Sequence, residues 1–199
     1  MPFRAGESLF GQNVVIVGAG GIALSLIDQL SPFNCKITVL RRSVQGPWPQ
    51  EFSHVHIDSY TNLSKYLSDA GIIFIAAAAT AETANLFSAK EFAAMTNKTV
   101  VVNVARGELI KTDDLVEALE KKQIMGAGLD VTAPEPLPEN HKLWTLMKNP
   151  ETNLIITPHT ADTPEQIFPL LTQRYQQNVT AVVKGDGNFV GRVDTSVGY

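Results

Sequence analysis

VVIVGAGGIA, residues 14–23, opens on a run of apolar, mostly β-branched residues and passes through three glycines into a segment with helical period. A strand that runs through a glycine turn into a helix is how a βαβ unit begins. Along the rest of the chain, short apolar runs alternate with longer helical segments, which is typical of a doubly wound parallel sheet. Strands are expected at residues 13–17, 36–40, 55–57, 72–77, 99–104, 127–129 and 154–156. Helices are expected at residues 22–30, 89–95 and 164–184, and from Thr112 onward.

The glycine turn has the spacing of a dinucleotide-binding loop, G-x-G-x-x-[GA]. Gly18 permits a tight turn, Gly20 lets the backbone approach a pyrophosphate, and the small Ala23 lets the helix pack on the strand. The amides of Gly21 and Ile22, at the start of the helix, would face the anion. The other interpretation is a glycine turn that binds nothing. The flanking strand and helix favour a Rossmann-like α/β domain over residues 1–199, with about seven parallel strands and helices on both faces of the sheet.

The end of the second expected strand indicates which dinucleotide binds. NAD-binding domains usually place an acidic residue there for the adenosine ribose, but this chain has Arg41, followed by Arg42 and Ser43. A carboxylate would repel a 2'-phosphate, whereas a guanidinium can pair with one bidentately. The segment therefore favours NADP, and NAD stays possible because neighbouring residues also shape the pocket. The alternative is that both arginines only solvate the end of a strand.

Composition excludes several classes of protein. A net charge of -4 and a pI of about 5.5 argue against general affinity for nucleic acid or anionic membranes. The start of the chain lacks the apolar core of a secretion signal, and the longest apolar run, Ile72 to Ala79, is too short to cross a bilayer. The single cysteine, Cys35, has no Cys/His cluster around it, so no metal is expected. We expect a cytoplasmic protein whose partners are small molecules.

Three further segments make the prediction more specific. They read NVARGE at residues 103–108, GLDVTAPEP at residues 128–136 and TPHTA at residues 157–161. Together with the glycine loop, these blocks resemble in order and spacing those of the D-isomer specific 2-hydroxyacid dehydrogenases, of the glyoxylate and hydroxypyruvate reductase type. The resemblance covers about residues 10–187. It implies an NAD(P)-dependent oxidoreductase that moves a hydride between nicotinamide and a small 2-hydroxy or 2-oxo acid.

The resemblance assigns catalytic roles to three side chains. His159 would take the proton of the substrate hydroxyl and return it in the reverse direction, since imidazole does both near neutral pH. Glu135 would hold the other ring nitrogen and stabilise the imidazolium. Arg106 would bind the substrate carboxylate and polarise the 2-oxo group. Taken singly, Arg106 could sit in a surface ion pair, Glu135 could be an ordinary loop residue, and His159 could be a satisfied core histidine.

The same resemblance implies further cofactor contacts. Asp130 matches the position that hydrogen-bonds the nicotinamide carboxamide, although it could instead cap a turn. The remaining expected contacts are Thr83, Val104, Ala105 and Ala161. Thr83 belongs to a segment that usually reads P-x-T-x-x-T and here lacks the proline, so a similar but less rigid loop is expected.

Two expectations concern the whole molecule. Family members carry a substrate domain built mainly from residues before the nucleotide-binding domain, and only about a dozen residues precede the first expected strand here. We therefore expect that the substrate domain is absent from this chain, and that the nucleotide-binding domain forms a homodimer. The alternative functions are a non-catalytic dinucleotide sensor, like the family's corepressor relatives, or an inactive fragment.

Overall fold

A computed structural model describes residues 8–161, 164–193 and 195. The chain divides into two compact units, Met1–Pro158 and His159–Tyr199.

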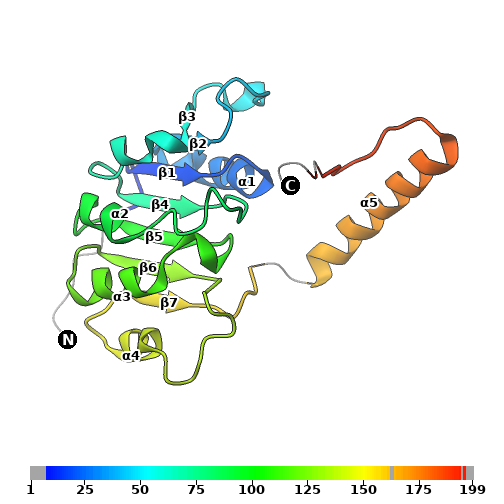
Figure 1. Ribbon diagram of the computed structural model, residues 1–199. Helices are drawn as coiled ribbons and strands as arrows, with labels where there is room; N and C mark the ends of the chain where they lie inside the picture. Colours follow the sequence, from blue (N-terminus) through cyan, green and yellow to red (C-terminus); the bar gives the residue numbers. More distant parts are fainter. Residues whose placement is uncertain (1–7, 162–163, 194, 196–199) are drawn as a thin grey trace. The chain divides into compact units, whose positions relative to one another are not determined.

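The first unit is built on one sheet of seven parallel strands (Figure 1). In sheet order β3-β2-β1-β4-β5-β6-β7, the order of the chain reverses between β1 and β4. The strands are β1 (Asn13–Val17), β2 (Lys36–Arg41), β3 (His56–Ser59), β4 (Ile72–Ile75), β5 (Val100–Asn103), β6 (Gly126–Leu129) and β7 (Leu154–Ile156). The fold class and the strand count predicted from the sequence are confirmed. The carboxyl ends of all seven strands meet at one edge, which is where open α/β sheets bind ligands.

Short helices connect the strands. The α-helices of this unit are α1 (Gly21–Leu30), α2 (Ala89–Ala94), α3 (Thr112–Glu120) and α4 (Lys142–Lys148). The 3-10 helices are η1 (Ser31–Phe33), η2 (Gln50–Phe52), η3 (Tyr60–Lys65) and η4 (Gly107–Leu109). The second unit contains α5 (Pro164–Lys184), with Pro169 inside the helix. Among the described residues, no helix is both long enough and apolar enough to cross a bilayer.

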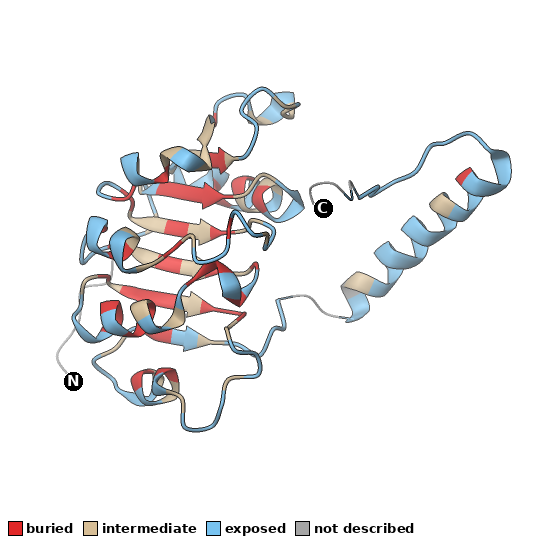
Figure 2. Ribbon diagram, in the orientation of Figure 1, coloured by how far each residue is buried: buried red, intermediate tan, exposed pale blue. Residues whose placement is uncertain are grey.

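Two apolar clusters lie on opposite faces of the sheet, since neighbouring residues of a strand point to opposite sides. On one face, Ile16 of β1 packs against Ala23 and Ile27 of α1. On the other face, the neighbouring strand residues pack against α2, α3 and α4. Strand β1 is buried from Val14 to Val17, whereas β4 and β5 alternate between buried and half-buried residues, as Figure 2 shows. Helices on both faces are therefore confirmed.

The face that carries α1 is covered unevenly. Strand register places four residues in one row across it, and these are Phe74, Val102, Gly128 and Ile155. Phe74 and Val102 are only half-buried, and Ile155 is 64% exposed. A hollow of about 920 Å³ on this face is lined by Phe74 and Val102 together with residues near the beginnings of the strands. Within the described part of the first unit, this face of the sheet thus presents apolar side chains that are only partly buried.

Candidate functional site

The glycine turn lies where the strand order reverses. Gly18 has a φ of +119°, and a Cβ at this position would lie 2.4 Å from the carbonyl oxygen of Ala76, just past β4. The Gly18 amide donates to the Leu40 carbonyl of β2 at 2.8 Å. The turn is therefore held between the ends of β2 and β4, and only glycine fits it without strain.

The residues after this turn leave space for an anion. Gly20 caps α1 without a side-chain hydrogen bond, and a Cβ on Gly20 or Gly21 would meet no atom within 4 Å. Ile22 is 47% exposed, whereas Ala23 is fully buried against the sheet. Amides at the open start of a helix suit a phosphate group. The geometry of this loop therefore fits the pyrophosphate of a dinucleotide.

The three residues expected to select NADP lie beside this loop, since Leu40 bonds Gly18. Arg41 does not simply extend into solvent: its Nη1 donates to the carbonyl oxygens of Gly46 at 3.4 Å and Pro47 at 3.0 Å. Arg42 and Ser43 are exposed. The sequence indicated the charge of this segment but not the contacts that Arg41 makes within it.

Thr83 orders the loop that follows β4. Its side chain is buried, and its hydroxyl donates to the Ala78 carbonyl at 2.7 Å and accepts from the Thr80 amide at 2.8 Å. These bonds tie the segment together at the point where the family's proline is missing. A direct contact of Thr83 with the cofactor stays a prediction.

Asn103 shapes the loop that carries Arg106. It is fully buried, its Nδ2 donates to the Arg106 carbonyl at 2.9 Å, and its Oδ1 accepts from the Ala105 amide at 3.0 Å. The Val104 amide donates to the carbonyl of Ile75 at 3.2 Å, which ties the loop to β4. The Arg106 side chain is exposed, and its Nη1 donates to the Ala105 carbonyl at 2.7 Å.

The loops after β5 and β6 contact each other closely. A Cβ on Gly107 would lie 2.0 Å from the carbonyl carbon of Thr132, so only glycine permits this approach. The Thr132 amide in turn donates to Glu135 Oε2 at 3.2 Å. Arg106 and Glu135 are thereby carried on adjoining loops at the same edge of the sheet.

Asp130 directly follows β6 and is 7% exposed. The hydroxyl of Thr157, which follows β7, donates to Asp130 Oδ1 at 2.5 Å. This bond fixes the carboxylate of a residue expected to meet the nicotinamide carboxamide. Neither Thr157 nor Asn103 was assigned a role from the sequence, although both stand inside the quoted blocks, because their roles depend on partners from other loops.

The remaining expected site residues belong to the second unit. His159 and Ala161 are exposed there, and His159 has a φ of +54°. Their roles rest on the family resemblance. Among the described residues, no group of three or more His, Cys, Asp or Glu side chains is placed to hold a metal ion.

Comparison with known proteins identifies the family. The sequence profile described as "D-isomer specific 2-hydroxyacid dehydrogenase, NAD binding domain" matches residues 2–161. The chain belongs to this family. The chain is 37% identical over 191 residues to an uncharacterized protein of Corynebacterium melassecola, and the aligned region covers 94% of the chain and 59% of that protein. It is 31% identical over 184 residues to a glyoxylate reductase of Thermofilum pendens, and the aligned region covers 92% of the chain and 52% of that protein.

A solved structure supports the fold. The D-isomer specific 2-hydroxyacid dehydrogenase of Xanthobacter autotrophicus, in complex with NADPH, superposes with a TM-score of 0.82 at 23% identity, over 98% of this chain and 75% of that one. At this identity the likeness is one of fold. The chain spans between one half and three fifths of the length of these two relatives.

Proposed function

We propose that this protein is an NADP-dependent oxidoreductase that transfers a hydride between the nicotinamide and a small 2-hydroxy or 2-oxo acid, with glyoxylate and hydroxypyruvate as the substrate class. The observation that carries the proposal is the adjoining pair of loops that hold Arg106 and Glu135. Close contact at Gly107 joins these loops at the edge of the sheet where the glycine turn also lies. The names of relatives such as the Thermofilum pendens enzyme support the substrate class.

The glycine turn and its neighbours are proposed to hold the cofactor. Gly20 and Gly21 would admit the pyrophosphate, and the segment 41–43 would meet the 2'-phosphate of NADP. Asp130, fixed by the Thr157 hydroxyl, would accept a hydrogen bond from the carboxamide. The cofactor supplies a hydride acceptor or donor. NAD remains a second candidate cofactor because it would use the same turn.

Arg106 and His159 are proposed to act on the acid. The guanidinium of Arg106 would bind the substrate carboxylate and polarise the 2-oxo group, while His159 would exchange the hydroxyl proton at C2. Glu135 would orient the imidazole and stabilise its charged form. Asn103 supports this arrangement because it fixes the backbone of the Arg106 loop.

We also propose that residues 1–199 form one functional nucleotide-binding domain, and that the protein is a cytoplasmic homodimer. The acidic net charge of -4 favours small-molecule partners over nucleic acid. The apolar row that ends at Ile155 supports self-association, since exposed apolar patches mark interaction surfaces.

The catalytic assignment is tested by steady-state oxidation of NADPH with glyoxylate. We expect His159→Ala to reduce kcat by roughly 10²–10⁴, the usual contribution of a general acid or base. Calorimetric titration with NADPH should give the same affinity for the variant as for the parent. A variant that turns over as fast as the parent would refute the role of His159. A parent that binds NADPH and turns over none of the 2-oxo acids would favour a dinucleotide sensor.

A further inference from the structure

The side chain of Arg41 lies against the loop that follows it. Besides its bonds to the carbonyls of Gly46 and Pro47 at 3.4 and 3.0 Å, its Cζ lies 5.9 Å from the centroid of the Trp48 ring. The guanidinium is thus held by two backbone acceptors and one aromatic ring. A planar fork that stacks on a ring is a geometry that arginine can adopt and lysine cannot.

Trp48 is itself held in place. Its Nε1 donates to the Phe52 carbonyl at 2.9 Å, and its ring centroid lies 6.4 Å from that of Phe52. Trp48 also packs, half-buried, against the apolar cluster that contains α1. The ring therefore gives Arg41 a fixed surface that is continuous with the core.

Gly46 leaves the room that the guanidinium occupies. A Cβ at this position would lie 2.4 Å from Arg41 Nη2. The Gly46 amide donates to the Ser43 carbonyl at 3.4 Å, which closes a turn over residues 43–46. An alanine at residue 46 is compatible with the backbone of the turn, but its Cβ would displace the end of the flexible Arg41 side chain.

We propose that Arg41 is a positioning residue, which sets the preference for NADP by fixing the turn over residues 43–46, and that Arg42 and Ser43 make the contacts to the 2'-phosphate. This inference rests on the proposed function, since it concerns the same cofactor. Gly46 and Trp48 become determinants of cofactor preference, although neither would touch the cofactor. The position of the segment beside Gly18, whose amide bonds Leu40, puts Arg42 and Ser43 where the adenosine ribose meets the sheet.

Replacing Arg41 with lysine distinguishes a positioning role from direct contact with the 2'-phosphate. A phosphate accepts a lysine as a point charge, so Arg41→Lys would keep most of the preference if Arg41 bound the phosphate directly. Both carbonyl bonds come from Nη1, and a lysine ammonium could make them from one nitrogen, but lysine has no planar group to stack on the Trp48 ring. If Arg41 acts through the turn, the Arg41→Lys variant loses the preference although its charge is retained.

The experiment compares Arg41→Lys, Gly46→Ala and Arg42→Gln with the parent by calorimetric titration with NADPH and NADH. The loss of one charge-assisted interaction corresponds to roughly tenfold in affinity. We expect each variant to weaken NADPH binding about tenfold and to leave NADH binding unchanged. The matched control is Gly128→Ala, whose Cβ would meet only Val102, at an ordinary 3.8 Å; both affinities should stay as in the parent. A general loss of structure would lower both affinities together, so the ratio of the two is the deciding quantity.

Fluorescence gives an independent readout. The chain has two tryptophans, so Trp144→Phe leaves Trp48 as the sole indole reporter. In that background, adenosine 2',5'-bisphosphate should change the emission of Trp48 more than adenosine 5'-monophosphate does, and Gly46→Ala should abolish the difference. The conservative Trp48→Phe variant, which keeps an aromatic ring beside Arg41, should retain more NADPH preference than Trp48→Leu.

The outcomes separate this inference from the proposed function. A parent that prefers NADPH, with the preference kept in Arg41→Lys and Gly46→Ala, would overturn the positioning role and leave the proposed cofactor intact. A parent that binds both cofactors equally, or neither, would overturn the NADP assignment and this inference with it.

Discussion

Asp58, on the edge strand β3, is a carboxylate that accepts three hydrogen bonds. Its Oδ2 accepts from the Tyr66 hydroxyl at 2.7 Å, and its Oδ1 accepts from Asn62 Nδ2 at 2.9 Å and from the Ser59 amide at 2.7 Å. Mainly through Tyr66, these bonds lower the pKa of Asp58 to about 2. The same contact raises the pKa of Tyr66 to about 12, because it favours the protonated phenol.

We expect Tyr66→Phe to raise the pKa of Asp58 toward its usual value of 3.8. The folded pKa of Asp58 is lowered, so its stabilisation is present above about pH 4 and is lost as the pH falls toward 2. The folded pKa of Tyr66 is raised, so its stabilisation is present below pH 10 and is lost as the pH rises through 12. The variant should therefore be less stable than the parent at pH 7, and the difference should shrink at both extremes.

Carbon-13 NMR titration of the Asp58 carboxyl and urea unfolding at several pH values measure these changes. Tyr175→Phe is the control, since Tyr175 is 72% exposed in α5. An Asp58 pKa that stays near 2 in Tyr66→Phe would show that the other donors suffice to hold it.

Single residues differ in how far the sequence reveals their role. Gly18 was predicted because its spacing in the glycine loop reports a backbone requirement, which its φ of +119° confirms. The contacts of Arg41 were not predicted, because they depend on how the next loop folds back. Gly107 is a similar case: its need for glycine arises from Thr132, a residue in another loop.

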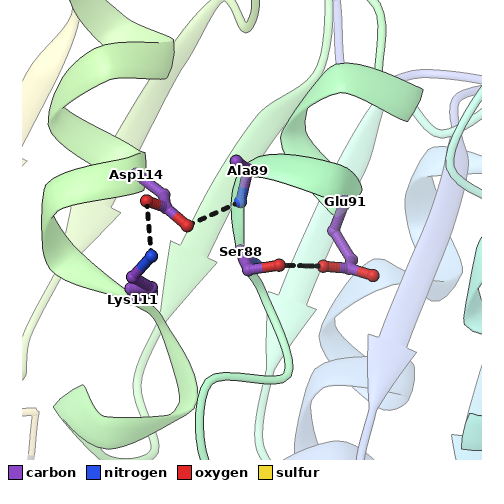
Figure 3. A network of polar contacts seen from close by, with 5 residues as sticks. All are labelled: Ser88, Ala89, Glu91, Lys111 and Asp114. Carbon is purple, nitrogen blue, oxygen red and sulfur yellow. Dashed lines mark hydrogen bonds and ion pairs between the residues drawn. The ribbon is translucent and has the colours of Figure 1, made fainter.

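At the scale of elements, α3 supplies a cap for α2 (Figure 3). Asp114 Oδ2 accepts from the Ala89 amide at 2.8 Å, while Lys111 Nζ lies 3.1 Å from Asp114 Oδ1. On the same helix end, Ser88 donates to Glu91 Oε2 through its amide at 3.1 Å and its hydroxyl at 2.7 Å. A helix as short as α2 depends on such bonds, since its first amides have no partner within the helix.

We expect Asp114→Ala to destabilise the fold by about 1 kcal/mol, the usual effect of removing a helix cap. The Ala89 amide lowers the pKa of Asp114 from 3.8, so the stabilisation is present above that pH and is lost as the pH falls below it. Urea unfolding at pH 7 and pH 3 should show a larger gap from the parent at pH 7. The control is Asp113→Ala, which removes an exposed charge from the same helical turn. Equal losses in the two variants would assign the effect to helix charge and not to the cap.

The predicted limits of strands and helices agree with the structure where apolar residues recur with a clear period. The limits of β1, β7 and α5 agree with those predicted, and α3 begins at Thr112 as expected. The strand predicted to reach Ala77 ends at Ile75, because the chain must turn there beside Gly18. Helix α4 and the four 3-10 helices were not predicted, since segments of one or two turns carry too little periodicity.

At the scale of the molecule, alternation of strands and helices predicted the parallel sheet, but it did not predict which part of each face is covered. The first crossover puts α1 against β1 and β2, and the later crossovers put α2, α3 and α4 on the opposite face. The row from Phe74 to Ile155 is only partly buried because α2, α3 and α4 lie on the opposite face of the sheet from α1. Residues along one row share a face, so the half-buried Phe74 and the exposed Ile155 belong to one apolar surface.

If the proposed homodimer uses this apolar row, a charge at Ile155 should weaken it. We expect Ile155→Asp to raise the dimer dissociation constant at least tenfold, because a carboxylate buried in an apolar interface pays a large desolvation penalty. Light scattering across a concentration series measures the change. The control, Phe33→Asp, charges an exposed apolar residue of η1 that lies outside the row, so it should leave the dimer intact. A dimer equally stable in both variants would place the interface elsewhere, and a parent that stays monomeric at high concentration would refute self-association of this chain.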